Sequence, residues 1–268
     1  EIGVRLVGSE MCIRDRCYVS PKISDIILMG SERIHLFDTP LLVSRNMGLA
    51  VDQRAAKRVM DILISGIGII ITSPIMLIIA IAVKAYDRGP VFYFQDRLTL
   101  GGKPFKICKF RSMCVDSEKN GARLASKHDS RITPVGHVLR NLHLDELPQL
   151  FNVFKGDMSL VGPRPERESI MLEYEKELPE FYYRLKVKAG LTGYAQVYGK
   201  YNTTPYDKLK LDLFYIENYS FLLDIKLIFM TVKIFFQKEV SEGVDDRQVN
   251  ALKDSGKNAG VSENKTEE

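Results

Sequence analysis

An uncharged apolar stretch from Ile62 to Val83 limits the folds that this chain can adopt. It holds roughly 22 apolar or small residues, and about 20 are enough for a helix to span a hydrocarbon core about 30 Å thick. A secretory signal peptide would lie at the N-terminus and end in a small-residue cleavage site. This stretch lies well inside the chain and has no such site, so it predicts a membrane helix that stays in the mature protein.

Ser73 and Pro74 interrupt the stretch near its middle. Proline removes a backbone donor, and the Ser73 hydroxyl can bond a carbonyl that has lost its partner, so a sharp bend is tolerable within lipid. From Ile62 to Ser73 a helix would rise about 18 Å, slightly more than half of the core. A helical hairpin that enters and leaves on one side is therefore a candidate, beside an ordinary kinked transmembrane helix.

Basic residues flank the stretch on both sides. They are Arg54, Lys57 and Arg58 before it, and Lys84 and Arg88 after it. Basic flanks favour the cytoplasmic side of a membrane. Because both flanks are basic, both ends of the stretch are expected on that side, which favours a re-entrant helix.

Charge and cysteine content narrow the partners and the compartment. Residues 239–268 carry eight acids and four bases, which leaves a net charge of about +8 on residues 1–238. A basic body suits nucleic acid, an anionic leaflet or a phosphorylated substrate, and the membrane stretch argues against nucleic acid. The four cysteines show neither disulfide-framework nor zinc-site spacing, so a reducing, cytoplasmic setting fits.

The chain divides into four segments by composition. Residues 1–16 contain LVGSEMCIRDR, which resembles translated sequencing-adapter DNA, so we expect them to be non-native and give them no functional weight. Residues 17–53 hold an apolar run and the turn-rich FDTPLL, typical of the end of a separate α/β accessory unit and its linker. Residues 240–268 are polar and predict a disordered tail. Residues 54–239 remain as the main domain, which carries the membrane stretch.

Within residues 54–239 the pattern predicts a mainly helical α+β fold. The two β-like runs Val91–Gln95 and Pro104–Arg111, with glycines between them, predict a small hairpin. The other expected elements are a membrane helix at about 55–87, helices at 144–154 and 166–188, a loop at 189–198 and an amphipathic interfacial helix at 221–236.

Asp145 and Glu146 form an acidic pair at the start of the helix predicted from Leu144, with Pro148 in its first turn. A helix start offers backbone donors to phosphate oxygens. An aspartate can attack phosphorus to form an acyl phosphate if a cation or a metal neutralises the phosphates. The candidate cations are Lys109, Arg111, Arg140 and Arg164. An acidic pair taken by itself is also typical of a helix cap or a solvated surface.

Taken together, Ala55 to Lys238 resembles the monotopic phosphoglycosyl transferase superfamily, also called bacterial sugar transferases or exopolysaccharide biosynthesis polyprenyl glycosylphosphotransferases. The motifs that carry the resemblance are Ser73-Pro74, KFRSM at 109–113, LDELPQLFNVFKGDMSLVGPRPE at 144–166, GLTGYAQV at 190–197 and LDIK at 223–226. No single motif would suffice. Ala189 and Tyr194 depart from the family, where many members have proline and tryptophan. Residues 17–53 resemble the junction to an accessory region in longer members, so we expect an N-terminally truncated member.

The resemblance implies a monotopic fold with a re-entrant helix bent at Ser73-Pro74, working from the cytoplasmic leaflet of a bacterial inner membrane. It implies transfer of a sugar phosphate from a UDP-sugar to undecaprenyl phosphate with release of UMP, the first membrane step of exopolysaccharide, capsule or O-antigen synthesis. The mechanism would be ping-pong with Mg²⁺ as cofactor.

Residue by residue, the resemblance makes Asp145 the nucleophile and Glu146 its partner. Lys109, Arg140 and Arg164 would bind substrate phosphates, and Asp145 with Asp224 would hold the metal. A nucleotide-sugar hydrolase and a non-catalytic scaffold of a glycan assembly complex are the alternatives. The sugar, the pathway and the formation of a homodimer stay open.

Overall fold

The computed structural model describes residues 10–13, 16–19, 21–36, 39–43, 49–114, 129, 131–199 and 203–235. The chain divides into two compact units, Glu1–Asn46 and Met47–Glu268. In the first, β1 (Glu10–Ile13) pairs with β2 (Arg16–Val19) and β3 (Glu32–Leu36) pairs with β4 (Thr39–Val43), both antiparallel, and α1 is Ile23–Met29. The tail predicted at 240–268 lies outside the described residues.

The second unit is mainly helical and contains two small pairs of strands. Its helices are α2 (Val51–Asp87), α3 (Pro134–Asn141), α4 (Gln149–Lys155), α5 (Glu168–Glu177), α6 (Tyr194–Tyr198), α7 (Pro205–Glu217) and α8 (Phe221–Phe235), with short 3₁₀ helices η1 (Leu100–Gly102), η2 (Leu144–Glu146) and η3 (Pro179–Lys186). β5 (Phe92–Leu98) and β6 (Pro104–Phe110) form an antiparallel hairpin, and β7 (Ser159–Val161) and β8 (Gly190–Thr192) are parallel. The predicted fold class is confirmed.

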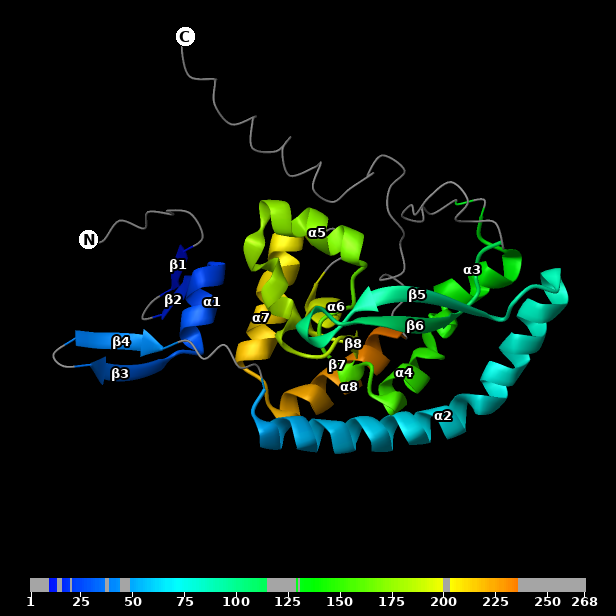
Figure 1. Ribbon diagram of the computed structural model, residues 1–268, viewed down its shortest axis with the longest axis horizontal. Helices are drawn as coiled ribbons and strands as arrows, with labels where there is room; N and C mark the ends of the chain where they lie inside the picture. Colours follow the sequence, from blue (N-terminus) through cyan, green and yellow to red (C-terminus); the bar gives the residue numbers. More distant parts are fainter. Residues whose placement is uncertain are drawn as a thin grey trace, which may run out of the picture. The chain divides into compact units, whose positions relative to one another are not determined.

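Helix α2 runs along one side of this unit and curves towards its C-terminal end (Figure 1). Pro74 lies inside the helix and has no N–H, which leaves the carbonyl of Ile70 without its usual donor. The Ser73 hydroxyl donates to that carbonyl at 2.8 Å. The predicted bend is therefore present, but as a curve of one continuous helix and not as a break between two arms of a hairpin.

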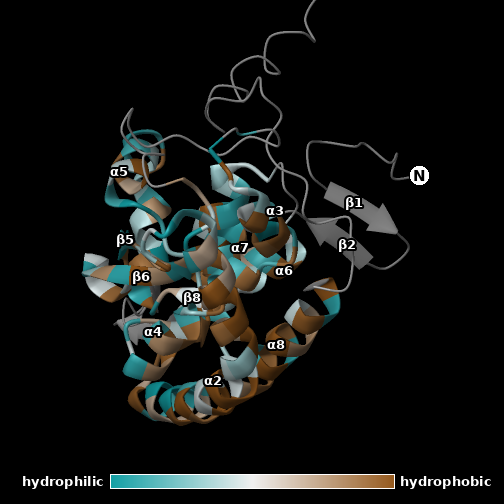
Figure 2. Cartoon of the chain, turned by 90° about the vertical axis from the view of Figure 1, so that its right-hand side faces the viewer, coloured by the Kyte–Doolittle hydropathy of each residue, from teal (hydrophilic) through white to brown (hydrophobic). Residues whose placement is uncertain are grey.

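The outer face of α2 is apolar and exposed. Its exposed side chains include Ile67, Ile70, Ile71, Leu77, Ile78 and Ile81. Figure 2 shows the apolar colour concentrated on α2 and α8. Among the described residues α2 is the one helix that is long and apolar enough to span a membrane, and only 17% of its most apolar window is buried. A bare apolar surface of this kind needs lipid or a partner, and we take the protein to be membrane-associated.

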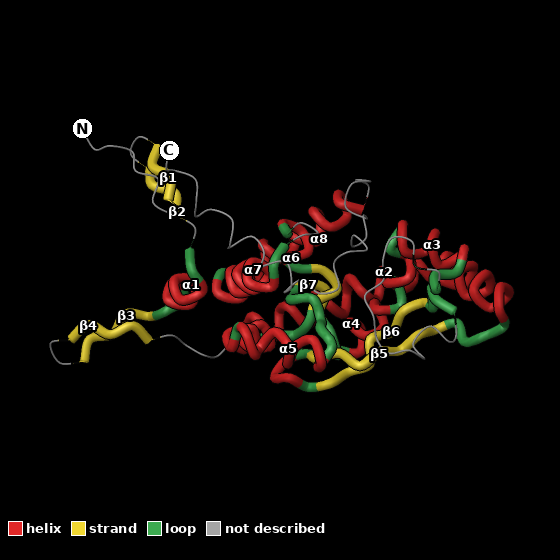
Figure 3. The backbone as a smooth tube through the Cα atoms, turned by 90° about the horizontal axis from the view of Figure 1, so that it is seen from above, coloured by secondary structure: helices red, strands yellow, loops and turns green. Residues whose placement is uncertain are grey.

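Both halves of α2 pack against the same unit. In the C-terminal half, Met76, Ile79 and Val83 are buried with Phe110 of β6 and Leu139 of α3. Figure 3 shows α3 beside that end of α2. The helix therefore lies along the body of the unit over much of its length.

The N-terminal half of α2 is attached through two of the basic residues that flank the apolar stretch in the sequence. The Lys57 ammonium is buried and lies 2.5 Å from the carboxylate of Asp224 in α8. Arg58 donates to the carbonyls of Val153 and Phe154, each at 2.8 Å, at the C-terminal end of α4. These two cations hold the fold together, so they do not serve as free flanking charges.

Two expected elements differ in the structure. The helix expected at 166–188 ends at Glu177, because Pro179 cannot continue it, and η3 follows. The loop expected at 189–198 contains β8 and α6. Three-residue strands such as β7 and β8 leave almost no periodic signal, and they pair across about thirty residues of sequence.

Candidate active site

The acidic pair lies on the short 3₁₀ turn η2, between α3 and α4. His143 precedes this turn in the left-handed conformation with φ of 52°, which turns the chain after α3. Pro148 then forms the N-cap of α4. The pair thus lies one turn before the α-helix and not in its first turn, which corrects the placement expected from the sequence.

Glu146 is bound by two of the predicted phosphate-binding cations. The Lys109 ammonium, from β6, lies 2.7 Å from its carboxylate, and the Arg164 guanidinium, from the segment after β7, lies 3.1 Å from the same oxygen. Burial acts to raise the pKa of Glu146, but the charges and hydrogen bonds of Arg164 and Lys109 outweigh it and hold this pKa well below its usual range. Glu146 therefore stays ionised and orients two cations.

Asp145 has a different environment. No hydrogen bond or ion pair holds its carboxylate among the described residues. Its pKa is raised, first by burial and then by the charge of Glu146, against the opposing charges of Lys109 and Arg140. An ionised carboxylate without a bonded partner is a better nucleophile than one that is neutralised.

Arg140 projects from α3 and acts on the same carboxylate through its charge. Its Nε donates to the hydroxyl of Ser112 at 2.8 Å, which fixes the guanidinium. The structure therefore brings Lys109, Arg140 and Arg164 together around the acidic pair. Arg111, in contrast, pairs with Asp87 at the end of α2.

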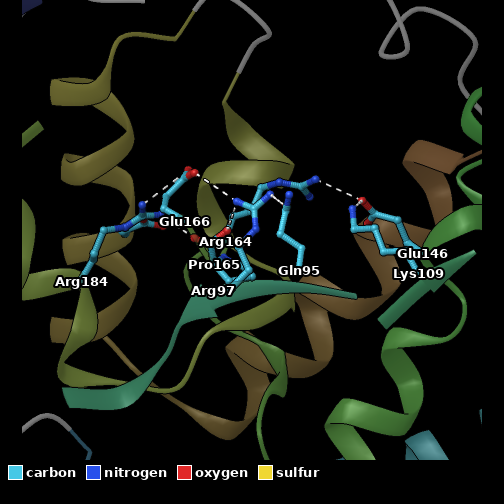
Figure 4. A network of polar contacts seen from close by, with 9 residues as sticks. Gln95, Arg97, Lys109, Glu146, Arg164, Pro165, Glu166 and Arg184 are labelled. Atoms are coloured by element: carbon cyan, nitrogen blue, oxygen red, sulfur yellow. Dashed lines mark hydrogen bonds and ion pairs between the residues drawn. The ribbon is translucent and has the colours of Figure 1, made fainter. Parts of the chain in front are cut away.

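A second layer of arginines, which the sequence pattern does not indicate, holds the segment carrying Arg164 (Figure 4). Arg184 donates to the carbonyl of Arg164 at 3.1 Å and pairs with buried Asp212 at 2.8 Å. Arg97 donates to the carbonyl of Pro165 at 3.1 Å. Both contacts join distant parts of the chain, and no local pattern around these arginines indicates them.

Asp224, the second predicted metal ligand, is not joined to the acidic pair. It is fully buried, and its carboxylate accepts from the Lys57 ammonium at 2.5 Å and from the Tyr215 hydroxyl at 2.7 Å. Over the described part of the chain, no group of three or more histidine, cysteine or acidic side chains could hold a metal. A magnesium ion that binds with a diphosphate needs only one or two carboxylates, so Asp145 alone fits the predicted metal role.

The fold and the site together describe a membrane-associated protein with a carboxylate pair surrounded by cations. Residues 52–238 match the bacterial sugar transferase family, and the chain belongs to that family.

The chain is 46% identical over 180 residues to a UDP-N-acetylgalactosamine-undecaprenyl-phosphate N-acetylgalactosaminephosphotransferase of Aeromonas hydrophila, covering 66% of this chain and 43% of that protein. It is 43% identical over 208 residues to a UDP-glucose:undecaprenyl-phosphate glucose-1-phosphate transferase of Klebsiella pneumoniae, covering 76% and 43%. A protein of the same name from Caulobacter vibrioides is 37% identical over 229 residues, covering 81% and 84%. The chain thus spans less than half the length of the first two relatives.

Proposed function

We propose that this protein transfers a sugar 1-phosphate from a UDP-sugar to undecaprenyl phosphate and releases UMP, as the first membrane step of a surface polysaccharide. The observation that carries the proposal is the pairing of an unbonded carboxylate, Asp145, with a neighbour, Glu146, that two cations neutralise. The names of the relatives supply the substrate classes.

In the first step an Asp145 oxygen attacks the β-phosphorus of the donor. A new O–P bond forms, the bond from that phosphorus to the bridging oxygen breaks, and its electron pair leaves on UMP. Lys109, Arg140 and Arg164 stabilise the negative charge that spreads over the phosphate oxygens. In the second step a phosphate oxygen of the acceptor attacks the same phosphorus and regenerates the Asp145 carboxylate.

Glu146 has a positioning role in this scheme. The acceptor is a phosphate monoester that is largely ionised at neutral pH, so no proton needs to be removed to activate it. A carboxylate whose pKa is held well below its usual range is a poor base. Glu146 instead holds Lys109 and Arg164 where the phosphates bind.

Mg²⁺ belongs to the proposal as a cofactor that would bind with the donor diphosphate at Asp145. When bound, it would neutralise phosphate charge and make the attack of a carboxylate on a diphosphate electrostatically feasible. Asp224 is left out of this role because Lys57 and Tyr215 already occupy its carboxylate.

The membrane side is also part of the proposal: α2 dips into the cytoplasmic leaflet of the inner membrane and the rest of the unit faces the cytoplasm. The packing of both halves of α2 on one folded unit supports this arrangement. If α2 crossed the bilayer, one of its halves would have to leave the folded unit on which it packs.

The test is to incubate purified protein in detergent with UDP-glucose or UDP-N-acetylgalactosamine, with and without undecaprenyl phosphate. We expect one of the donors to yield a lipid-linked product and UMP. Steady release of UMP without the lipid would instead identify a hydrolase, and no release from any UDP-sugar would overturn the proposal.

We predict that Asp145→Asn lowers turnover on the order of 10⁴-fold or more, because an amide is a poor nucleophile. Without acceptor, intact-protein mass spectrometry should find a phosphosugar adduct on the wild type and none on this variant. Asp96→Asn, at an exposed carboxylate of β5, is the matched control and should keep both activity and adduct. An adduct on Asp145→Asn would show that another residue is the nucleophile.

A further inference from the structure

A small pocket beside the acidic pair has a strongly basic lining. Its polar side chains are Arg97, Lys109, Gln149 and Arg164. It is a narrow hollow that is open to solvent and cannot enclose a whole small molecule. The pocket therefore fits one group of a larger ligand.

Gln149 is the least expected part of this lining. The residue is 3% exposed, and its amide Nε2 has no hydrogen-bond partner among the described residues. It is the first residue of α4, directly after the turn that carries Asp145 and Glu146. Buried polar groups are almost always paired, so an unpaired donor on a residue that lines a pocket indicates a ligand with a hydrogen-bond acceptor.

Arg97 offers a second unpaired donor in the same pocket, since its buried Nε also has no partner in the described chain. Its other two nitrogens bind the Gln95 side chain and the Pro165 carbonyl, which hold the guanidinium in place. The three cations of the lining, Arg97, Lys109 and Arg164, pair with two carboxylates, Glu166 and Glu146, which leaves excess positive charge. Two donors and this excess charge select an anion.

Asp145 does not line the pocket. A phosphorus atom under attack must lie against the Asp145 carboxylate, so a phosphate held in the pocket is a different one. In a diphosphate donor, the phosphate next to the attacked one is the phosphate that stays on the departing nucleotide.

We propose that this pocket binds the nucleotide-side phosphate of the donor, with Gln149 Nε2 and Arg97 Nε as donors to its oxygens. This inference rests on the proposed function. When the bond to the attacked phosphorus breaks, the electron pair stays on the bridging oxygen of the nucleoside monophosphate, and the pocket stabilises the resulting charge.

The test replaces Gln149 with leucine, which keeps the volume and removes the donor. We expect Gln149→Leu to weaken inhibition by UMP about tenfold, the usual size for a hydrogen bond to a charged group. Inhibition by uridine, which lacks the phosphate, should not change. The thermal unfolding temperature of the free protein should stay the same or rise, because an unpaired buried amide is removed.

Gln196→Leu is the matched control. The Gln196 amide is also buried without a partner in the described chain, but it does not line the pocket. This variant should leave UMP inhibition unchanged.

Three results would overturn the inference. In the first, Gln149→Leu leaves UMP inhibition unchanged. In the second, it raises KM for undecaprenyl phosphate while UMP inhibition stays the same, which would mean that the pocket binds the acceptor. In the third, it lowers the unfolding temperature and weakens inhibition by UMP and by uridine alike, which would mean that the amide has only a structural role. Failure of the proposed function would look different, because the wild type itself would then form no lipid-linked product, whatever Gln149→Leu does to inhibition by UMP.

Discussion

At the scale of single residues, the two carboxylates of the acidic pair are separated by their surroundings. Glu146 accepts from Lys109 and Arg164, whereas Asp145 has no bonded partner among the described residues and a raised pKa. Adjacent carboxylates whose pKa values are shifted in opposite directions are typical of active sites in which similar side chains have different roles. In the proposed reaction, Glu146 orients the two cations and Asp145 is the carboxylate that attacks.

The pH dependence of the reaction should follow Asp145, which must be ionised to attack. Because its pKa is raised, the acid limb of kcat/KM for the donor should lie above the ordinary aspartate range of about 3.9. Glu146→Gln removes a neighbouring negative charge, so the limb should move to lower pH even as the maximal rate falls. Arg140→Gln removes a positive charge and should move it to higher pH. Shifts in the opposite directions, measured in steady-state pH profiles, would contradict this assignment.

At the scale of elements, α2 acts as a support for the site as well as a membrane anchor. A Cβ at Gly68 would lie 3.3 Å from Leu150, and one at Gly66 would lie 3.5 Å from Phe154, so α4 packs closely on this glycine-containing part of α2. Arg58 binds the last carbonyls of α4. The helix α4 begins shortly after the acidic pair. The packing of α2 against α4 therefore helps to fix the position of the pair.

The Lys57–Asp224 pair should lock α2 to α8. Lys57→Met and Asp224→Leu each leave a buried charge unpaired, and each should lower the free energy of unfolding by about 3–5 kcal/mol. The double variant should cost less than either single one. Lys155→Met breaks an exposed pair with Asp157 and should cost less than about 1 kcal/mol. Unfolding in detergent measures all four variants.

The same variants distinguish a structural ion pair between Lys57 and Asp224 from a metal site at Asp224. If Asp224 held Mg²⁺, Asp224→Leu would change the Mg²⁺ dependence of turnover and Lys57→Met would not restore stability. If the losses in free energy of unfolding from the two single variants simply added up in the double variant, the structural ion pair would be contradicted.

At the scale of the whole second unit, the apolar face of α2 lies opposite the face that packs on the body. Met76, Ile79 and Val83 are buried, while Leu77, Ile78 and Ile81 are exposed on the same turns. A helix that is covered on one side by its own unit and bare on the other suits the interface between water and lipid.

Labelling of single cysteines tests this arrangement. In a variant whose four cysteines are replaced by serine, Val51→Cys and Tyr86→Cys place thiols at exposed positions near the two ends of α2, 75% and 53% exposed. In oriented vesicles or cells, a membrane-impermeant maleimide should react with both only from the cytoplasmic side. Reaction of the two thiols from opposite sides would establish a crossing helix. Gly89 is unsuitable because a Cβ there would collide with Arg111.

Much of this protein could be predicted from local pattern. The structure confirms the long apolar helix, its bend at Ser73-Pro74, the β5–β6 hairpin and α8. Each of these elements is indicated by a signal within its own stretch of sequence, such as an uncharged run, a proline, a pair of glycines or an apolar helical period. The order of the motifs also pointed to the family.

Tertiary structure alone decided which charges meet. In the sequence Lys57 resembles a membrane flank and Asp224 a metal ligand, yet they form one buried pair, and Arg97 and Arg184 meet the segment of Arg164 across the fold. An ion pair depends on where the backbone carries two side chains, and residues 167 positions apart in sequence, as in the Lys57–Asp224 bond, share no local signal. For the same physical reason, the unpaired amide of Gln149 beside a basic pocket became visible only in the folded chain.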